Sequence, residues 1–167
     1  MKKKFLCIMF SMFAVIVMVE AQNKTFRVML KTLLSHSVTE VNVAQAKAAQ
    51  AKYAYLLDAR EQREFEVSHL ENARFVGYND FSLDRVADIP KDSAIVVYCS
   101  VGYRSEKVGE KLIAAGYNHV VNLYGGIFQW VNEDNPIVDV TNSPTQKVHA
   151  YSKSWGIWLK KGEKVYK

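Results

Sequence analysis

Cysteine is scarce in this sequence, since Cys7 and Cys99 are the only two among 167 residues. Cys7 lies in an apolar N-terminal run that we expect to be removed, which leaves Cys99 with no internal disulfide partner. Exported proteins ordinarily use their cysteines in pairs. A single cysteine left in such a protein is therefore either a reactive thiol or a site of bonding between chains.

Metal-ligand spacing is also missing. His36, His119 and His149 are isolated in the sequence and no second thiol is retained, so we expect no zinc site. The glycine pair Gly125-Gly126 is not followed by the lysine of a phosphate-binding loop, and it is interpreted as a turn.

No strong excess of one charge is present. The formal net charge is +5, but a chain that begins at Gln22 has 19 basic and 16 acidic residues. Residues 138–167 hold six basic and two acidic residues, so the excess lies in the C-terminal segment. This balance does not favour a nucleic-acid-binding protein.

Only one long apolar run occurs, over residues 5–19. Three lysines precede it, and the small residues of Val19-Glu20-Ala21 follow it. This pattern predicts a cleaved secretory signal peptide over residues 1–21 and a periplasmic or extracellular protein. The run is shorter than the roughly 20 residues of a membrane span, so we expect no stable span; a retained anchor is the alternative.

Helical and strand-like patterns alternate along the chain. They predict an α/β domain over residues 40–137, with a mainly parallel sheet flanked by helices on both faces. A lead-in segment over 22–39 is expected to hold an amphipathic helix at 26–34. The expected strands are 41–43, 53–57, 73–76, 94–98 and 119–123. The expected helices are 44–52, 61–67, 79–88, 105–115 and 127–131.

Residues 138–167 form a C-terminal tail of different character. A turn is expected over 141–145, followed by an aromatic, extended segment over 149–159. We expect the tail to pack on the domain through Trp155 and Trp158, with its lysines in solvent. An exposed aromatic patch there would instead indicate an interface for a partner protein. A tail that lies near Cys99 could also narrow the active-site pocket.

Cys99 follows the buried strand expected at 94–98 and precedes a helix. A tight loop at this junction can direct backbone N–H groups at one centre, and the helix N-terminus adds positive charge. Gly102 gives the loop its backbone freedom, and Arg104 adds a permanent cation suited to an anionic substrate. These features predict a largely thiolate Cys99 in an anion-binding cradle.

Four ordered motifs resemble the rhodanese (sulfurtransferase) domain family. The cysteine loop is similar to the family pattern C-x-x-G-x-R-S. The other three resemble its L-D-x-R-x-x-x-E-F, G-H-I-x-G-A and L-x-G-G-x-x-x-W segments. Ser68 and Asn72 replace the two glycines of the G-H-I-x-G-A segment. In this chain the motifs are Cys99–Ser105, Leu57–Phe65, Ser68–Ala73 and Leu123–Trp130.

The resemblance implies a sulfurtransferase that moves a sulfane sulfur from thiosulfate or a related small anion to cyanide or a thiol. Cys99 would be the nucleophile and would carry the sulfur as a persulfide. It implies no metal and no organic cofactor. Substrate binding would fall to the loop amides and to the Arg104 side chain; the residues are Ser100, Val101, Gly102, Tyr103 and Arg104.

Asp58, Arg60 and Ser105 are expected to support the site. Asp58 directly follows the strand expected at 53–57, so we expect it at the same sheet edge as Cys99. An Arg60–Glu64 pair, four residues apart, is expected to fix the loop above that strand. His69 is interpreted as structural and Trp130 as a core residue.

Two other functions remain open. Phosphatases and arsenate reductases of related fold use the longer loop C-x-x-x-x-x-R, whereas here Arg104 closes a shorter C-x-x-x-x-R loop that suits a single sulfur atom. The other alternative is a sulfur-carrying or thiol-binding module with little free turnover, which meets a protein thiol through the tail. The loop also lacks the C-G-S-G-V-T pattern of mercaptopyruvate sulfurtransferases, which favours thiosulfate or a persulfide as donor.

Overall fold

The computed structural model describes residues 24–52 and 54–167. The chain divides into two units at residues 33 and 34, and only residues 24–33 of the first unit are among the described residues. In the first, residues 24–33 are helical, which confirms the helix expected there. The signal peptide expected over residues 1–21 lies outside the described residues, so export stays a prediction.

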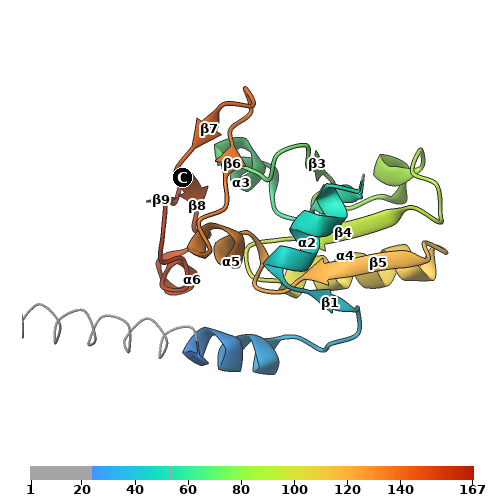
Figure 1. Cartoon of the computed structure of the whole chain (residues 1–167), viewed down its shortest axis with the longest axis horizontal. Coiled ribbons are helices and arrows are strands. Elements are labelled where there is room, and N and C mark those ends of the chain that lie inside the picture. The colour runs from blue at the N-terminus through green and yellow to red at the C-terminus, as the bar shows by residue number, and fades with distance from the viewer. Residues whose placement is uncertain (1–23, 53) are drawn as a thin grey trace, which may run out of the picture. The chain divides into compact units, whose positions relative to one another are not determined.

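The second unit is built on a five-stranded parallel sheet (Figure 1). This confirms the expected mainly parallel α/β fold. The strand order across the sheet is β1-β5-β4-β2-β3. The strands are β1 (Glu40–Val41), β2 (Tyr55–Asp58), β3 (Arg74–Phe75), β4 (Ala94–Tyr98) and β5 (His119–Leu123).

The central strand β4 is buried on both faces. Ile95 and Val97 belong to a core cluster that also includes Val108 and Leu112 of α4 (Tyr103–Ala114). Val96 and Tyr98, which alternate with them, are buried as well. Successive side chains of a strand point to opposite faces, so β4 has packing partners on both sides. The other helices that precede the tail in this unit are α2 (Val43–Gln50), α3 (Gln62–Val67) and α5 (Gly126–Asn132).

One expected helix is wrong. In place of a helix over 79–88, only the 3₁₀ turn η1 (Leu83–Val86) forms. The Ser82 side chain accepts from the Asp84 amide and starts the turn there. Upstream, the Arg85 guanidinium donates to the Val76 carbonyl and to Asp80, which ties the preceding residues into a loop.

Most other elements form within one or two residues of their expected bounds, and two of these shifts have a clear local cause. The strand expected over 41–43 is β1 (Glu40–Val41), because Asn42 and Gln45 cap one another and start α2 at Val43. Helix α4 begins two residues before the expected Ser105, because Gly102 in the left-handed region serves as its N-cap.

The tail is more structured than expected. It contains β6 (Ile137–Val138), β7 (Pro144–Thr145), β8 (Lys147–His149), α6 (Lys153–Gly156) and β9 (Glu163–Val165). The extended segment expected over 149–159 is therefore wrong, because Ser152 caps the helical turn α6 within it. Trp155 and Trp158 are only half-buried, whereas Val148, His149 and Leu159 are fully buried.

Within the two described ranges, none of the helices combines the length and apolarity needed to cross a membrane.

Candidate active site

Cys99 lies in the loop that joins β4 to α4, beyond the carboxyl end of the sheet. Asp58, the last residue of β2, is the register partner of Tyr98, so Asp58 and Cys99 lie at one sheet edge as expected. Functional groups in parallel sheets gather at this edge. Cys99 is fully buried, and Ser100 and Val101 are nearly so.

Gly102 brings a backbone donor to the sulfur. Its amide donates a hydrogen bond to Cys99 Sγ over 3.1 Å. The glycine has a φ of +118°, which a residue with a side chain rarely adopts. Gly102 is the N-cap of α4, so its amide lies at the positive end of that helix. The structure thus places one backbone N–H donor at the sulfur, and the largely thiolate Cys99 expected from the sequence stays a prediction.

A second helix N-terminus holds the cysteine loop from beneath. The amides of Ile127 and Phe128, in the first turn of α5, donate to the carbonyls of Cys99 and Ser100 over 2.9 and 3.1 Å. Gly126 makes this approach possible, since a Cβ there would lie 2.3 Å from the Cys99 carbonyl oxygen. The glycine pair is thus more than the turn expected from the sequence: it lets α5 support the nucleophile.

We expect Gly126→Ala to damage the site beyond its cost in backbone strain. Gly116→Ala is the matched control, because Gly116 also has positive φ but nothing lies within 4 Å of its Cβ position. The control should lose about 1 kcal/mol of stability and keep its kcat. Gly126→Ala should lose more stability and at least about tenfold in kcat, because the Cys99 carbonyl must move. Denaturant titration and steady-state kinetics measure both; equal behaviour of the two variants would contradict this role of Gly126.

Ser105 and Asn122 fix the other side of the loop. Asn122 Nδ2 donates to the Gly102 carbonyl over 2.9 Å, and Ser105 Oγ lies 3.0 Å from the same oxygen. Ser105 Oγ is also 2.7 Å from Asn122 Oδ1. Both residues are fully buried. The expected supporting residue Ser105 is thus joined by Asn122, a polar residue within apolar β5 that the sequence analysis missed.

Glu64 is the ion-pair partner of Arg104. The Nη1 and Nη2 atoms of Arg104 donate to the Glu64 carboxylate over 2.6 and 2.8 Å. Ser100 Oγ lies 3.0 Å from the same carboxylate and accepts from Arg104 Nη2 over 2.9 Å. Burial favours a raised pKa for Glu64, but the hydrogen bonds and charge of Arg104 outweigh it and lower the pKa to about 2. Glu64 is therefore ionised at neutral pH.

Arg104 is held at the rim of the loop. Its side chain is 12% exposed. Burial favours a lower pKa for its guanidinium, but hydrogen bonding to Glu64 and the charges of Cys99 and Glu64 raise it. The expected contact between Arg104 and an anionic donor stays a prediction, and the structure adds a second role in which Arg104 ties the loop to α3.

The expected Arg60–Glu64 pair is wrong, because each residue has a different partner. Arg60 Nε and Nη2 donate to Asp58 over 2.9 and 2.6 Å, and neither side chain is exposed. Arg60 Nη2 also donates to the Ser68 carbonyl over 2.6 Å. Asp58 and Arg60 thus support the sheet edge and the segment after α3, while α3 directs Glu64 to the cysteine loop.

His69 occupies a structural position, as expected. The His69 amide donates to the Val138 carbonyl over 2.8 Å, and the Val138 amide donates to the His69 carbonyl over 2.9 Å. These two bonds join the tail to the domain. The His69 ring stacks on Phe65 with centroids 3.9 Å apart.

His149 of the tail is a buried histidine whose packing the sequence analysis did not foresee. Its Nδ1 accepts from the Tyr151 amide over 3.2 Å, and its Nε2 is buried without a hydrogen-bond partner in the structure. Burial lowers its pKa, and the charges of Arg63, Arg60 and Arg104 lower it further, while Glu64 opposes the change. The neutral ring is therefore the form that fits the folded chain.

This burial predicts a pH dependence of stability. The unfolded chain protonates His149 as the pH falls through about 6.5, while the folded chain resists protonation, so the unfolded state binds more protons. The free energy of unfolding should therefore decrease below pH 6.5. His149→Asn keeps an acceptor near Nδ1 and cannot titrate. Denaturant titrations from pH 7.5 to 5.5 should show a shallower pH slope for this variant; an equal slope would exclude His149 as a source of the dependence.

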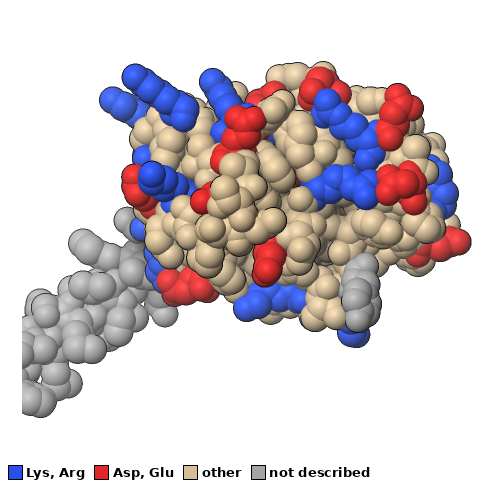
Figure 2. All heavy atoms as spheres, turned by 90° about the horizontal axis from the view of Figure 1, so that it is seen from above, with Lys and Arg blue, Asp and Glu red and all other residues tan. Residues whose placement is uncertain are grey.

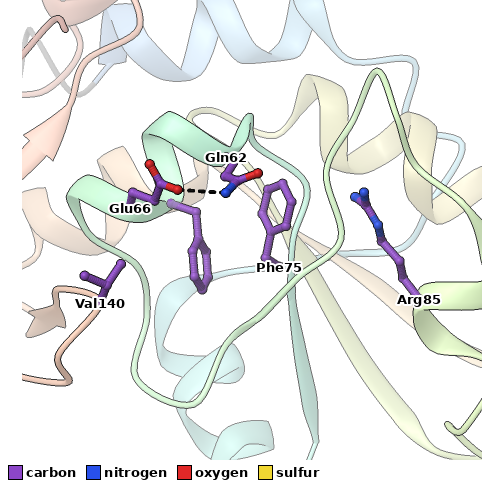
Figure 3. A pocket seen from close by; sticks show the side chains of 6 residues that line it. Gln62, Glu66, Phe75, Arg85 and Val140 are labelled. Carbon is purple, nitrogen blue, oxygen red and sulfur yellow. Dashed lines mark hydrogen bonds between the residues drawn. The ribbon is translucent and has the colours of Figure 1, made fainter.

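A shallow pocket of about 440 Å³ lies on another side of α3 (Figure 3). The labelled side chains come from α3, β3, η1 and the start of the tail, and the cysteine loop does not line it. Its lining residues are Gln62, Phe65, Glu66, Phe75, Arg85 and Val140.

On the face drawn in Figure 2, basic and acidic side chains are interspersed.

Comparisons with known proteins agree with this geometry. Residues 41–133 match the rhodanese-like domain family. "Thiosulfate sulfurtransferase 18" of Arabidopsis thaliana is 34% identical over 125 residues, covering 66% of this chain and 91% of that protein. A "Sulfurtransferase" of Allochromatium vinosum is 44% identical over 54 residues, covering 32% of this chain and 50% of that protein. A solved rhodanese-like domain from Anabaena has 20% identity and a TM-score of 0.56, covering 62% of this chain and 81% of its own, which supports the fold.

Proposed function

Because the chain belongs to the rhodanese-like domain family and is a sulfurtransferase, we propose that it transfers a sulfane sulfur from thiosulfate through a persulfide on Cys99. The observation that carries this proposal is the Gly102 amide, which donates to Sγ at the positive end of α4. Such donors stabilise a thiolate before reaction and the terminal sulfur of a persulfide after it. Thiosulfate is the proposed donor because a relative that this chain matches over 91% of its length carries thiosulfate in its name.

The proposed reaction balances without a redox partner. The Cys99 thiolate attacks the sulfane sulfur, the S–S bond of thiosulfate breaks, and the electron pair leaves with sulfite. The product is a Cys99 persulfide anion. Cyanide or a thiol then attacks the outer sulfur, and the electron pair of the persulfide bond returns to Cys99.

The surrounding residues have distinct proposed roles in these steps. The amides of residues 100–104 bind the negative charge, with Gly102 at the sulfur. Ser105 and Asn122 fix the Gly102 carbonyl, and α5 holds the carbonyls of Cys99 and Ser100. Arg104 contributes positive charge at the rim, and the Glu64 contact limits its movement toward the donor.

Thiocyanate formation from thiosulfate and cyanide tests the proposal. We expect turnover that saturates in thiosulfate and follows a double-displacement rate law, because sulfite leaves before cyanide reacts. Phosphate esters should not be hydrolysed, and arsenate should not be reduced in the presence of a thiol. If phosphate esters were hydrolysed and no sulfane donor produced thiocyanate, the assignment to thiosulfate would be wrong.

A further inference from the structure

Tyr151 covers the outer side of the active-site loop. Its ring lies against the guanidinium of Arg104, 5.2 Å from Arg104 Cζ to the ring centroid. Tyr151 itself is 44% exposed, whereas the Arg104 side chain is 12% exposed and Glu64 is fully buried. The ring therefore stands between solvent and the charged end of the loop.

The chain holds Tyr151 in this position at the expense of backbone strain. Its φ is +62°, a conformation that residues other than glycine rarely adopt. The Tyr151 amide donates to the buried His149 Nδ1. On either side of Tyr151, the Ala150 amide donates to the Val165 carbonyl over 2.8 Å, and the Ser152 amide donates to the Ala150 carbonyl over 2.7 Å. A strained residue that its neighbours fix beside a reactive loop indicates a functional placement.

We infer that Tyr151 is a specificity-determining residue, which closes one wall of the sulfur-transfer site and restricts it to small anionic donors. This inference rests on the proposed function. It also goes beyond the family, because the family match ends at residue 133 and the wall is built by the tail. A bulky group on the donor would meet the Tyr151 ring before its sulfane sulfur reached Cys99.

Tyr151→Gly is the informative variant. Glycine removes the ring and readily adopts a φ of +62°, so the tail should keep its fold. Tyr151→Phe keeps the ring over Arg104. Ile157→Ala is the matched control, because Ile157 is a 54% exposed apolar residue of the same tail. Circular dichroism and thermal unfolding confirm that each variant is folded.

The first measurement compares kcat/KM for thiosulfate and for benzenethiosulfonate, a singly charged anion that keeps the sulfane sulfur and carries a phenyl ring in place of one oxygen. Because both ratios are compared between variants, the difference in charge between the two donors is common to all of them. Tyr151→Gly should raise the ratio of benzenethiosulfonate to thiosulfate by about tenfold. Tyr151→Phe and Ile157→Ala should leave the ratio within about twofold. An unchanged ratio in Tyr151→Gly would overturn the inference.

A second measurement does not depend on sulfur transfer. Cys99 is alkylated with iodoacetamide and with its N-phenyl derivative, and the Cys99 peptide is quantified by mass spectrometry. Tyr151→Gly should increase the rate at which the larger reagent alkylates Cys99, relative to the rate for the smaller reagent. If this occurs while the wild type transfers sulfur from no donor, the wall is supported and the proposed function is wrong. If the relative rates match those of the wild type, Tyr151 does not limit access to Cys99.

Discussion

Cys99→Ser should lower the rate of thiocyanate formation by at least about 10³-fold, the scale of loss seen when an enzyme loses its nucleophile. Serine has nearly the same shape, but its hydroxyl is a far weaker nucleophile at neutral pH and cannot accept the sulfur as a persulfide. The Gly102 amide can donate to the serine oxygen in place of Sγ, so the fold should persist. Steady-state kinetics measure the loss.

The stability of Cys99→Ser separates chemistry from folding. The variant should unfold within a few degrees of the wild type, because the substitution exchanges a single atom in a site that already offers a hydrogen-bond donor. A folded variant that kept more than a tenth of the wild-type rate would show that Cys99 is not the nucleophile.

Glu64→Gln should cost the protein about 3 kcal/mol of stability, and lower the melting temperature by about 10 °C. Glu64 is fully buried, and its carboxylate accepts from Arg104, Ser100 and the Glu61 amide. A glutamine presents an NH₂ group to some of these donors and leaves the guanidinium of Arg104 without a counter-charge. Removing one partner of a buried ion pair is costlier than removing both. Thermal and denaturant unfolding measure the change.

Glu66→Gln provides the control on the same helix. Glu66 is exposed, and its side chain accepts from Gln62 over 2.8 Å. We expect a change within about 0.5 kcal/mol. The wild-type advantage over Glu64→Gln should persist to pH 4.5 and shrink as the pH falls toward 2, because protonation of Glu64 then removes the same charge. Similar losses in the two variants would contradict the central role of the Glu64–Arg104 pair.

The parts of the fold that were predictable from the sequence have local signals. The apolar run 94–98 and the run 119–123 are the strands β4 and β5 with the expected bounds. Gly102, the N-cap of α4, and Arg104, in the first turn of α4, follow Cys99 closely in the sequence, so the position of the thiol at a strand–helix junction could also be predicted. Local spacing was sufficient because each of these elements is continuous in sequence.

The parts that were missed depend on contacts between distant segments. Arg60 and Glu64 are four residues apart, a spacing typical of a helical pair, yet Arg60 precedes α3 and turns back to Asp58. Glu64 instead contacts Arg104 of another element. Asn122 gave one usable signal, a polar residue inside an apolar strand.

The role of the tail was the least predictable part. From the sequence we expect Trp155 and Trp158 to anchor the tail, but both are only half-buried. The fully buried side chains of the tail include Val148, His149 and Leu159. Tyr151 has no motif around it, and its place over Arg104 depends on the folded path of the whole tail. The family resemblance gives no help here, because it covers only the preceding domain.

Mass spectrometry of the protein after incubation with thiosulfate tests the central claim most directly. We predict the gain of one sulfur atom, about 32 Da, on the peptide that contains Cys99, and its removal by cyanide. Cys99→Ser should gain no mass. The absence of an adduct with any sulfane donor, or an adduct that persists in Cys99→Ser, would contradict sulfur transfer through Cys99.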